Sequence, residues 1–570
     1  MKLPYQVFNK LLSPSSKWKF VFLIFLSAIA ALLETLSVSM ILPYVLALSD
    51  PEAILENSLV RILSRWLSMN QENVVYILSA GLALVFLLKN LYLWALDVAK
   101  RKFVMQESFS TRKRVYQIYL NKPYAYFLTH HSQDITNMIC YYVTWVFGTL
   151  QNLLTFFSEI LVLILLMGLM VKVNAVITLV VFAISSGFFL ITRKPLKTKL
   201  EALGRQINKT HDKMTKSVSQ SINGIREIKL LQLEDKTLED FDAYKEGKVD
   251  AEVQQSALLS VQKRMTEVFA IFVILFCVLL CVHMESTASM FSTLALVAMV
   301  MLRLRPGLNQ IFHCLNYFST CTPSLRKLNN IINSQDASWE SVKEKPLSFQ
   351  HAIQVENLCY SYDGTHPVLA DVNMTIPKGS IIGLKGMSGG GKTTFANILL
   401  GLLQPDAGSV RVDGTDIHEH RAAWFPLVSY IPQDIFLMDS TIRDNVVFFR
   451  EQDDSRVWDA LEKAQLYDFV KALPHGLDTV VGEKGVRLSG GQRQRLGIAR
   501  AVYQDAQVFI FDEPTAALDE TLEKDIMDVV FSLENRTIIL IAHRLHTLNR
   551  CDRIYEVGDL RVQEAGHVLD

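Results

Sequence analysis

Six long apolar stretches in the first 304 residues constrain this chain more than any other feature. A helix needs about 20 mainly apolar residues to cross the roughly 30 Å hydrocarbon core of a bilayer. Some of the stretches are shorter, so we expect those helices to continue into flanking polar sequence. The sequence predicts a multi-pass membrane domain of six helices. The stretches run from Phe20 to Leu48, Val74 to Leu96, Tyr141 to Val171, Val176 to Ile191, Val268 to Met284 and Met290 to Leu302.

The composition of the chain argues against several classes of function. The 570 residues include 57 basic and 57 acidic side chains, so the chain has no net field to attract nucleic acid, and we expect no nucleic-acid partner. Its seven cysteines form no CxxC pair and no even-numbered framework, which argues against zinc ligation and disulfide stapling. The first apolar run is too long for the core of a signal peptide, so we interpret it as a retained anchor.

Loop charge predicts the orientation of the membrane domain. The segment from Asp97 to Ala125 holds seven basic residues against two acids, whereas the segment from Ser49 to Asn73 holds two against four. Basic loops stay in the cytoplasm. We therefore expect the N-terminus and the soluble half in the cytoplasm and the chain in an inner or plasma membrane. A helical repeat of apolar residues from Leu55 to Leu67 predicts either an outer interfacial helix or a cap on the bundle mouth.

Three charged residues fall inside predicted spans: Glu34, Lys89 and Glu159. Intramembrane charges are costly and usually face a bundle interior or a wet cavity. For each of them the sequence leaves two interpretations open, a hydrogen bond between helices or a place in a substrate cavity.

The composition changes after Ser334 to that of a soluble α/β domain. The segments Ile353–Tyr362, 381–384, 508–511 and 538–541 are predicted strands. After the second of them, residues 386–393 read GMSGGGKT, which matches the phosphate-binding pattern GxxxxGK[ST]. Backbone N–H groups of such a loop wrap phosphate oxygens, its lysine reaches the terminal phosphates, and its hydroxyl binds Mg²⁺.

Two further motifs follow in order. Residues 488–492 read LSGGQ, which alone would be an ordinary glycine turn opening a helix. The apolar strand 508–511 then ends in Asp512 and Glu513, the arrangement expected when one acid holds Mg²⁺ and the next polarises water. An acidic pair after a strand is as often a helix cap, but the three motifs in this order favour a nucleotide site.

These motifs, together with the six spans, make the sequence resemble an ATP-binding cassette (ABC) exporter with fused membrane and nucleotide-binding domains. The resemblance covers essentially the whole chain. It implies an all-α, six-helix transmembrane domain over residues 1–334, a linker over 335–349, and an α/β P-loop nucleotide-binding domain over 350–570.

The resemblance also implies roles for single residues. Tyr362 matches the aromatic that stacks on adenine, Gln433 the Q-loop glutamine, and His543 the switch histidine that contacts the γ-phosphate. Asp519 matches the D-loop aspartate, and residues 479–485 resemble the exporter X-loop, with Val480 where an acid is common. The expected catalytic residues are Glu513, His543 and Gln433, and the expected metal ligands are Thr393, Gln433 and Asp512. The expected ATP-binding residues are Tyr362, Gly386, Ser388, Gly389, Gly390, Gly391, Lys392, Thr393, Thr394, Ser489, Gly490, Gly491, Gln492 and Asp519.

In this family the LSGGQ of one subunit closes over ATP held by the other, which implies a dimer. Because Lys392, Ser489, Glu513 and His543 are all intact, a homodimer is the simplest interpretation, and a heterodimer with a degenerate partner is the alternative. Glu513 would act as general base for attack of water on ATP, while Lys392, Mg²⁺ and His543 stabilise the transferring phosphoryl group. Segments 121–127 and 220–230 are the expected coupling helices.

The transported molecule is the property that the sequence indicates least clearly. Residues 32–44 and 303–309 resemble segments of exporters that flip lipid-linked oligosaccharides, although Gln310 stands where a second arginine is expected. We therefore predict ATP-driven flipping of a lipid-linked oligosaccharide or similar anionic lipid. The alternatives are an exporter of a peptide or amphipathic small molecule and an ATP-gated channel. The candidate substrate residues, which could equally anchor helix ends at the interface, are Glu34, Lys263, Arg264, Arg303 and Arg305.

Overall fold

The computed structural model describes residues 2–40, 71–173, 175–284, 287–333, 347–515, 520–533, 535–542 and 544–565. The chain divides into two compact units. One consists of Met1–Lys122 and His130–Ser338, and the other of Pro123–Thr129 and Trp339–Asp570. Most of the expected linker, residues 335–346, lies outside the described residues.

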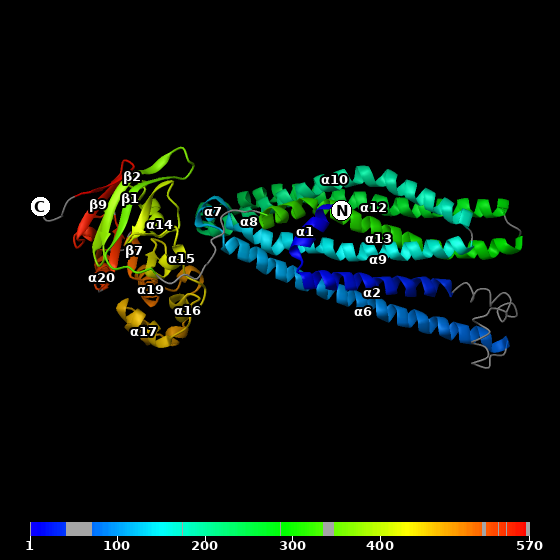
Figure 1. Ribbon diagram of the computed structural model, residues 1–570, viewed down its shortest axis with the longest axis horizontal. Coiled ribbons are helices and arrows are strands. Elements are labelled where there is room, and N and C mark those ends of the chain that lie inside the picture. The colour runs from blue at the N-terminus through cyan, green and yellow to red at the C-terminus, as the bar shows by residue number, and fades with distance from the viewer. Residues whose placement is uncertain are drawn as a thin grey trace. The chain divides into compact units, whose positions relative to one another are not determined.

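The first unit is a bundle of long helices (Figure 1). Helix α6 has 50 residues, which at 1.5 Å per residue gives about 75 Å, more than twice the thickness of the hydrocarbon core. Helix α6 is therefore long enough to run well beyond the bilayer. Its elements are α1 (Lys2–Leu11), α2 (Pro14–Ser39), α6 (Gln71–Leu120), α8 (Ser132–Asn137), the π-helical turn η1 (Met138–Tyr142), α9 (Val143–Val173), α10 (Ala175–Asn223), α11 (Ile225–Leu231), α12 (Glu234–Met284) and α13 (Thr287–Asn333).

Four segments of the described chain are long and apolar enough to cross a membrane: Pro14–Ser37, Ser79–Leu120, Ser132–Val171 and Ala175–Asn223. They contain or overlap the first four predicted spans. The fifth and sixth fall in α12 and α13, where the side chains of 280–300 lie outside the described residues, as does the predicted outer helix from Leu55 to Leu67.

The bundle is apolar on the outside as well as inside. Phe25 on α2 and Leu87 and Trp94 on α6 are among the large side chains exposed on its surface. Inside, α9, α10, α12 and α13 share a buried cluster that includes Val181 and Val273. Exposed apolar side chains around a packed interior are what a bundle solvated by lipid requires.

The second unit contains two sheets. One is antiparallel, with strand order β2-β1-β4-β5, and the other has the order β10-β9-β3-β8-β7-β6, in which only β10 pairs antiparallel. Four strands, β1, β3, β7 and β8, coincide with the predicted ones. The strands are β1 (Ala352–Ser361), β2 (Pro367–Pro377), β3 (Ile381–Lys385), β4 (Ala407–Val412), β5 (Thr415–Asp416), β6 (Val428–Ile431), β7 (Val508–Asp512), β8 (Thr537–Ile541), β9 (Arg553–Gly558) and β10 (Arg561–Glu564).

Helices cover the six-stranded sheet. The helices of this unit are α7 (Tyr124–Thr129), α14 (Lys392–Leu399), α15 (Arg421–Trp424), α16 (Ile442–Val447), α17 (Asp454–Lys463), α18 (Tyr467–Ala472), α19 (Gly490–Tyr503), α20 (Glu520–Phe531) and α21 (Leu545–Leu548), with short 3₁₀ turns at 425–427, 476–478 and 483–485.

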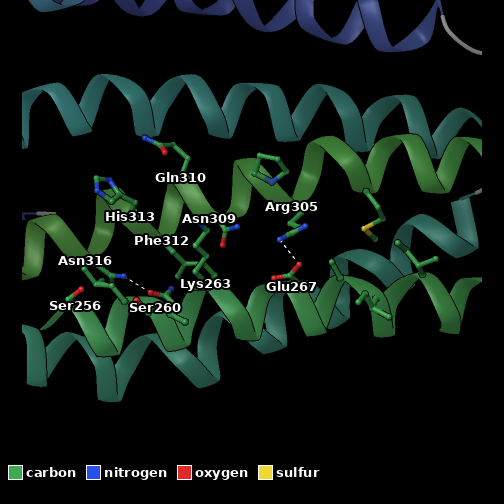
Figure 2. Close-up of a pocket in the computed structure, with 17 residues that line it drawn as sticks. Ser256, Ser260, Lys263, Glu267, Arg305, Asn309, Gln310, Phe312, His313 and Asn316 are labelled. Carbon is green, nitrogen blue, oxygen red and sulfur yellow. Dashed lines mark hydrogen bonds and ion pairs between the residues drawn. The ribbon is translucent and has the colours of Figure 1, made fainter. Parts of the chain in front are cut away.

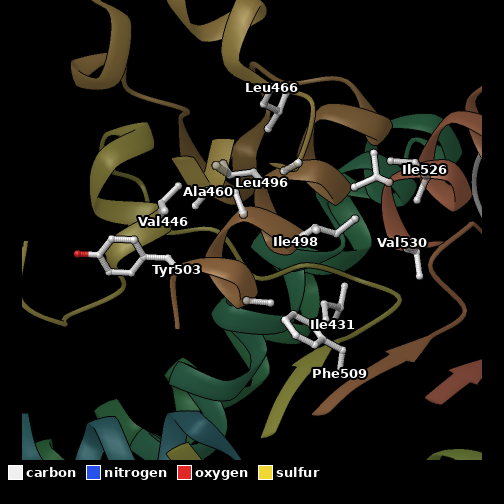
Figure 3. Close-up of a cluster of buried hydrophobic side chains, with 14 of the residues drawn as sticks. Ile431, Val446, Ala460, Leu466, Leu496, Ile498, Tyr503, Phe509, Ile526 and Val530 are labelled. Atoms are coloured by element: carbon white, nitrogen blue, oxygen red, sulfur yellow. The ribbon is translucent and has the colours of Figure 1, made fainter. Parts of the chain in front are cut away.

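Strand β7 is buried along its whole length and separates two apolar cores. Phe509 and Phe511 point into one core, and Val508 and Ile510 into the other, as the two-residue period of a strand requires. Figure 3 shows the first core, in which side chains of α19 and α20 meet Phe509. The strand that ends in Asp512 is thus fixed from both faces.

Candidate functional site

The loop between β3 and α14 forms a cradle that only glycines allow. Gly386, Gly389 and Gly391 have φ of +154°, +80° and +98°. A Cβ on Gly386 would lie 2.1 Å from the carbonyl oxygen of Val557. The loop can therefore bring successive backbone N–H groups close to an anion at the N-terminus of α14, which is the geometry of a phosphate site.

Lys392 supplies the charge of this cradle. The residue is 5% exposed, and its Nζ donates to the carbonyl oxygens of Gly386 and Met387 at 2.9 Å each. Burial lowers the pKa of the Lys392 ammonium, and the nearby carboxylates of Glu513 and Asp512 oppose that shift. The ammonium is thus held over the loop where a phosphate oxygen would replace the carbonyls.

A hydroxyl and a carboxylate meet beside the cradle. Thr393 Oγ1 donates to Asp512 Oδ2 at 3.1 Å, and Asp512 is 6% exposed at the end of β7. The two oxygens are of the kind that a small hard cation prefers. Gln433, the third expected ligand, is exposed two residues beyond the end of β6.

Tyr430 is a site residue whose role the sequence did not indicate. Its hydroxyl donates to Asp512 Oδ2 at 3.0 Å, and burial together with that carboxylate raises its pKa. The contact exists because β6 pairs in parallel with β7 and places Tyr430 beside Ile510. Strand neighbours of this kind cannot be read from spacing along the chain.

Glu513 follows Asp512 in a strained conformation. Its φ is +50°, and its backbone N–H donates to the carbonyl oxygen of Ile541 at 2.9 Å. A non-glycine residue in this region costs about 1–3 kcal/mol and persists only where the surroundings hold it, most often at functional sites.

Tyr362 lies beside the first turn of α14, near the cradle. Its hydroxyl is 3.1 Å from Thr394 Oγ1, and its ring rests edge-on against Tyr360 with centroids 5.1 Å apart. The residue is 56% exposed, so the ring offers a free face on which a planar base could stack.

Comparison with known proteins gives this geometry its context. The family model described as "ABC transporter transmembrane region" matches residues 18–304, half of the chain, and the model described as "ABC transporter" matches 369–516. The chain belongs to the ABC transporter family. It is an integral membrane protein that binds nucleotide and couples ATP hydrolysis to transport.

Similar proteins include two named ATP-dependent lipid A-core flippase. The one from Thiobacillus denitrificans is 29% identical over 79% of this chain and 78% of its own length. The one from Paraburkholderia xenovorans is 28% identical over 80% and 77%. A solved structure of a bacterial Atm1-family ABC exporter with ATP bound has a TM-score of 0.82, with 19% identity, over 96% of this chain and 94% of its own. The transporter therefore has the exporter fold.

The signature segment of the transporter opens α19. Ser489 caps this helix: its hydroxyl accepts from the N–H of Gln492 at 3.2 Å, and Gln492 Oε1 accepts from the N–H of Ser489 at 2.8 Å. Ser489 is exposed, and Gly490 and Gly491 form the first turn behind it. The LSGGQ motif is thus pre-formed at an exposed helix N-terminus, where a second subunit's nucleotide could reach it.

Two expected site residues, Asp519 and His543, lie outside the described residues. The segment that follows His543 is held by Glu523 of α20, a buried residue that the sequence analysis missed. Glu523 accepts hydrogen bonds from Thr547 Oγ1 at 2.7 Å and His546 Nε2 at 3.1 Å, and also from Arg544. Burial would raise the pKa of Glu523, but these donors outweigh it and the pKa is lowered.

The first expected coupling segment forms α7. Residues Pro123–Thr129 belong to the same compact unit as the nucleotide-binding domain, and Tyr124 packs against the second apolar core of that unit. The second expected segment forms α11 in the helical unit. The coupling role of both segments stays a prediction.

Most of the charged residues that the sequence singles out in the membrane domain belong to one of two groups. The first is a partly buried junction of three helices, where Arg303 of α13 binds Glu34 of α2 and Glu159 of α9. Arg303 Nε lies 2.6 Å from Glu34 Oε1, and Arg303 Nη2 lies 3.1 Å from Glu159 Oε2. Lys89 also joins helices, because its Nζ donates to Ser37 Oγ at 3.3 Å. Of the two interpretations left open for these charges, the contacts favour the bond between helices.

The second group lines a cavity of about 750 Å³ between α12 and α13 (Figure 2). Lys263 and Arg305, two of the five expected substrate residues, lie there with Gln310. Arg305 binds Glu267 at 3.0 Å, whereas Lys263 has no ion-pair partner in the described part of the chain. Glu34, Arg303 and the exposed Arg264 do not line this cavity.

The Glu523 network gives a first prediction. Glu523→Gln keeps an acceptor for Thr547 but removes the charge that holds Arg544 and His546. Because hydrogen bonds to charged groups contribute about 1.5–3 kcal/mol, we expect a lower Tm and slower ATP turnover. Asp528→Asn on the same helix removes only an exposed pair with Arg550 and should change neither. If the two variants change the Tm and the ATP turnover equally, Glu523 does not position the segment that follows His543.

The three-helix junction gives a second prediction. Arg303→Met leaves two partly buried carboxylates without their cation, which should cost at most about 3–5 kcal/mol. Adding Glu34→Gln and Glu159→Gln removes the uncompensated charges and should restore most of the lost thermal stability of the purified transporter. Unfolding followed in detergent measures both. If the triple variant melts as low as the single one, the uncompensated charge of the two carboxylates is not the cause of the lost stability.

Proposed function

We propose that this transporter is a homodimer that uses ATP to flip an anionic lipid-linked oligosaccharide, or a similar anionic lipid, across the membrane by alternating access. The observation that carries the proposal is the cavity between α12 and α13. Two cations and one carboxylate line it, so it keeps one positive charge, and Ala270, Ile271 and Met301 provide an apolar wall beside them. The two relatives named lipid A-core flippase support the same class of cargo.

The chemistry follows from the nucleotide site. Thr393 and Asp512, with Gln433, would hold Mg²⁺, which when bound neutralises charge on the phosphates. Lys392 holds the terminal phosphates, and Glu513 accepts a proton from the attacking water. His543 and Asp519 complete the site by resemblance. The basic segment 97–125 supports a cytoplasmic nucleotide-binding domain and N-terminus in an inner or plasma membrane.

The dimer turns nucleotide binding into movement. Exporters with one membrane and one nucleotide-binding domain in each chain generally work as dimers. Two copies would place the exposed Ser489 of each over the cradle of the other, and ATP would favour the closed pair. ATP thereby supplies free energy that differs between two states of the membrane domain, which is what transport requires.

Flipping can be tested with the base removed. Vesicles reconstituted with the full chain and a fluorescent lipid-linked oligosaccharide should show ATP-dependent loss of label accessibility. Glu513→Gln should abolish it and lower ATP turnover by about 10²- to 10⁴-fold, while ATP binding persists because the cradle is intact. Flipping that continues in this variant would contradict the mechanism. Stimulation of turnover by a peptide and not by the glycolipid would indicate a peptide exporter instead.

Shared sites can be tested by mixing two defective chains. Lys392→Ala and Ser489→Trp should each inactivate a homodimer, because each damages both composite sites. A mixed dimer collects both defects in one site and leaves the other intact, so we expect turnover to return on mixing and reassembly. A chain carrying both changes, mixed with wild type, leaves no intact site and is the control. No recovery in the first mixture, with dimers formed, would contradict head-to-tail sites.

A further inference from the structure

The cavity between α12 and α13 changes in chemistry along its length (Figure 2). At one end its wall is apolar, with Ile271, Ile274 and Met301. The charged pair Arg305–Glu267 and Lys263 follow. At the other end lie neutral polar side chains, including Ser260, Asn316 and Gln262. Ile274 and Gln262 are 12 residues apart on α12, which corresponds to about 18 Å along the helix.

Two amides at the polar end are buried without a full set of partners. Gln262 is 6% exposed and Asn316 is 3% exposed. Asn316 Nδ2 donates to Gln262 Oε1, while Gln262 Nε2 and Asn316 Oδ1 have no hydrogen-bond partner among the residues that the structure describes. Each amide carries two donors and an acceptor with two lone pairs. One bond therefore leaves most of the pair's capacity unused.

The number of missing hydrogen bonds does not depend on how the two amide groups are oriented. Turning both amides by 180° would make Gln262 Nε2 the donor and Asn316 Oδ1 the acceptor, and would leave the other nitrogen and the other carbonyl unpaired. Turning one alone would set two like atoms against each other. In every orientation a donor and an acceptor remain buried and unsatisfied, which is rare in folded proteins and costly.

Neighbouring side chains add further polar groups to the same end. Thr266 Oγ1 donates to Asn309 Oδ1, which leaves the amide nitrogen of Asn309 available at the cavity wall. The hydroxyl of Ser260 and the imidazole of His313 line the cavity as well. None of these groups carries a fixed charge. A ligand that satisfies them must offer both donors and acceptors and need not be ionised there.

We propose that Gln262 and Asn316 form a subsite for an uncharged sugar bearing hydroxyl or acetamido groups. Lys263 lies next to it as the phosphate subsite, and the apolar end holds the lipid chain. The cargo is then a lipid phosphate that carries a neutral sugar directly after the phosphate. This inference rests on the proposed function and adds which part of the head group the transporter reads. Sugar hydroxyls complete the amide pair, whereas a bare lipid phosphate leaves it unsatisfied.

The test compares two ligands that differ only in the sugar. Full-length transporter in phosphatidylcholine nanodiscs is titrated with a polyprenyl methyl phosphate and with the same lipid carrying one N-acetylglucosamine in place of the methyl group, so that both ligands are phosphodiesters with one negative charge. Two or more gained hydrogen bonds should make the glycosylated lipid bind about 10-fold tighter or better. The double variant Gln262→Leu with Asn316→Leu should bring the ratio of the two Kd values close to one. Lys263→Met should weaken binding of both lipids by a similar factor.

Two further measurements separate recognition from folding. Because the double variant removes both buried amides together, its Tm should stay level or rise. The control is Asn208→Leu, which removes a buried amide that is satisfied by Ser324 Oγ at 2.8 Å and does not line the cavity. It should lower the Tm and leave the ratio of Kd values unchanged. A double variant that melts lower and keeps its preference would show that the amides are structural.

The outcomes also distinguish this inference from the proposed function. If the wild type binds neither lipid, or if peptides displace the glycosylated lipid and bind tighter, the proposed cargo class is wrong. If it binds both lipids with equal affinity, a lipid phosphate is the cargo but the sugar subsite is refuted. If it prefers the glycosylated lipid and the double variant keeps that preference, the sugar is read elsewhere.

Discussion

Burial of β7 on both faces is the constraint on which the nucleotide half of the transporter depends. The two cores that hold the strand also hold α14 on one side and α19 on the other. The strand therefore places Asp512 against Thr393, while α19 carries the signature motif on a helix packed against the same strand. A polar substitution within β7 would disturb both halves of the ATP site, although it touches neither.

Motifs of the ATP site could be predicted because each is local. A glycine loop, a helix cap and an acid after an apolar strand are specified by residues a few positions apart, and the structure places the loop, the cap and the strand where the sequence indicated. Tyr430 and Glu523 could not be predicted. Tyr430 reaches Asp512 because two strands distant in sequence are paired, and Glu523 meets residues more than 20 positions away. Contacts of this kind depend on the tertiary fold.

In the membrane half, composition indicated the spans but not the partners of the charges inside them. The cost of a charge in hydrocarbon predicts that it finds a partner, and nothing in the local sequence says which. The structure joins Glu34, Glu159 and Arg303, so that three helices are tied by one guanidinium. It gathers Lys263 and Arg305 at a cavity instead. Four of the five candidate substrate residues that looked equivalent in sequence are thereby divided between two sites, and Arg264 belongs to neither.

The nucleotide site and the cavity between α12 and α13 differ in how fully their polar groups are hydrogen-bonded within the chain. This difference matters for transport. At the nucleotide site Lys392, Thr393 and Ser489 already have partners within the chain. At the cavity, one hydrogen bond joins Gln262 of α12 to Asn316 of α13. The other buried amide atoms of the pair, Gln262 Nε2 and Asn316 Oδ1, have no partner in the described part of the chain. Because the two amides sit on different helices, any sliding of α12 against α13 changes the pair that a ligand meets. Affinity at this position is therefore tied to the conformation of the bundle, and only an affinity that differs between two conformations can move cargo in one direction.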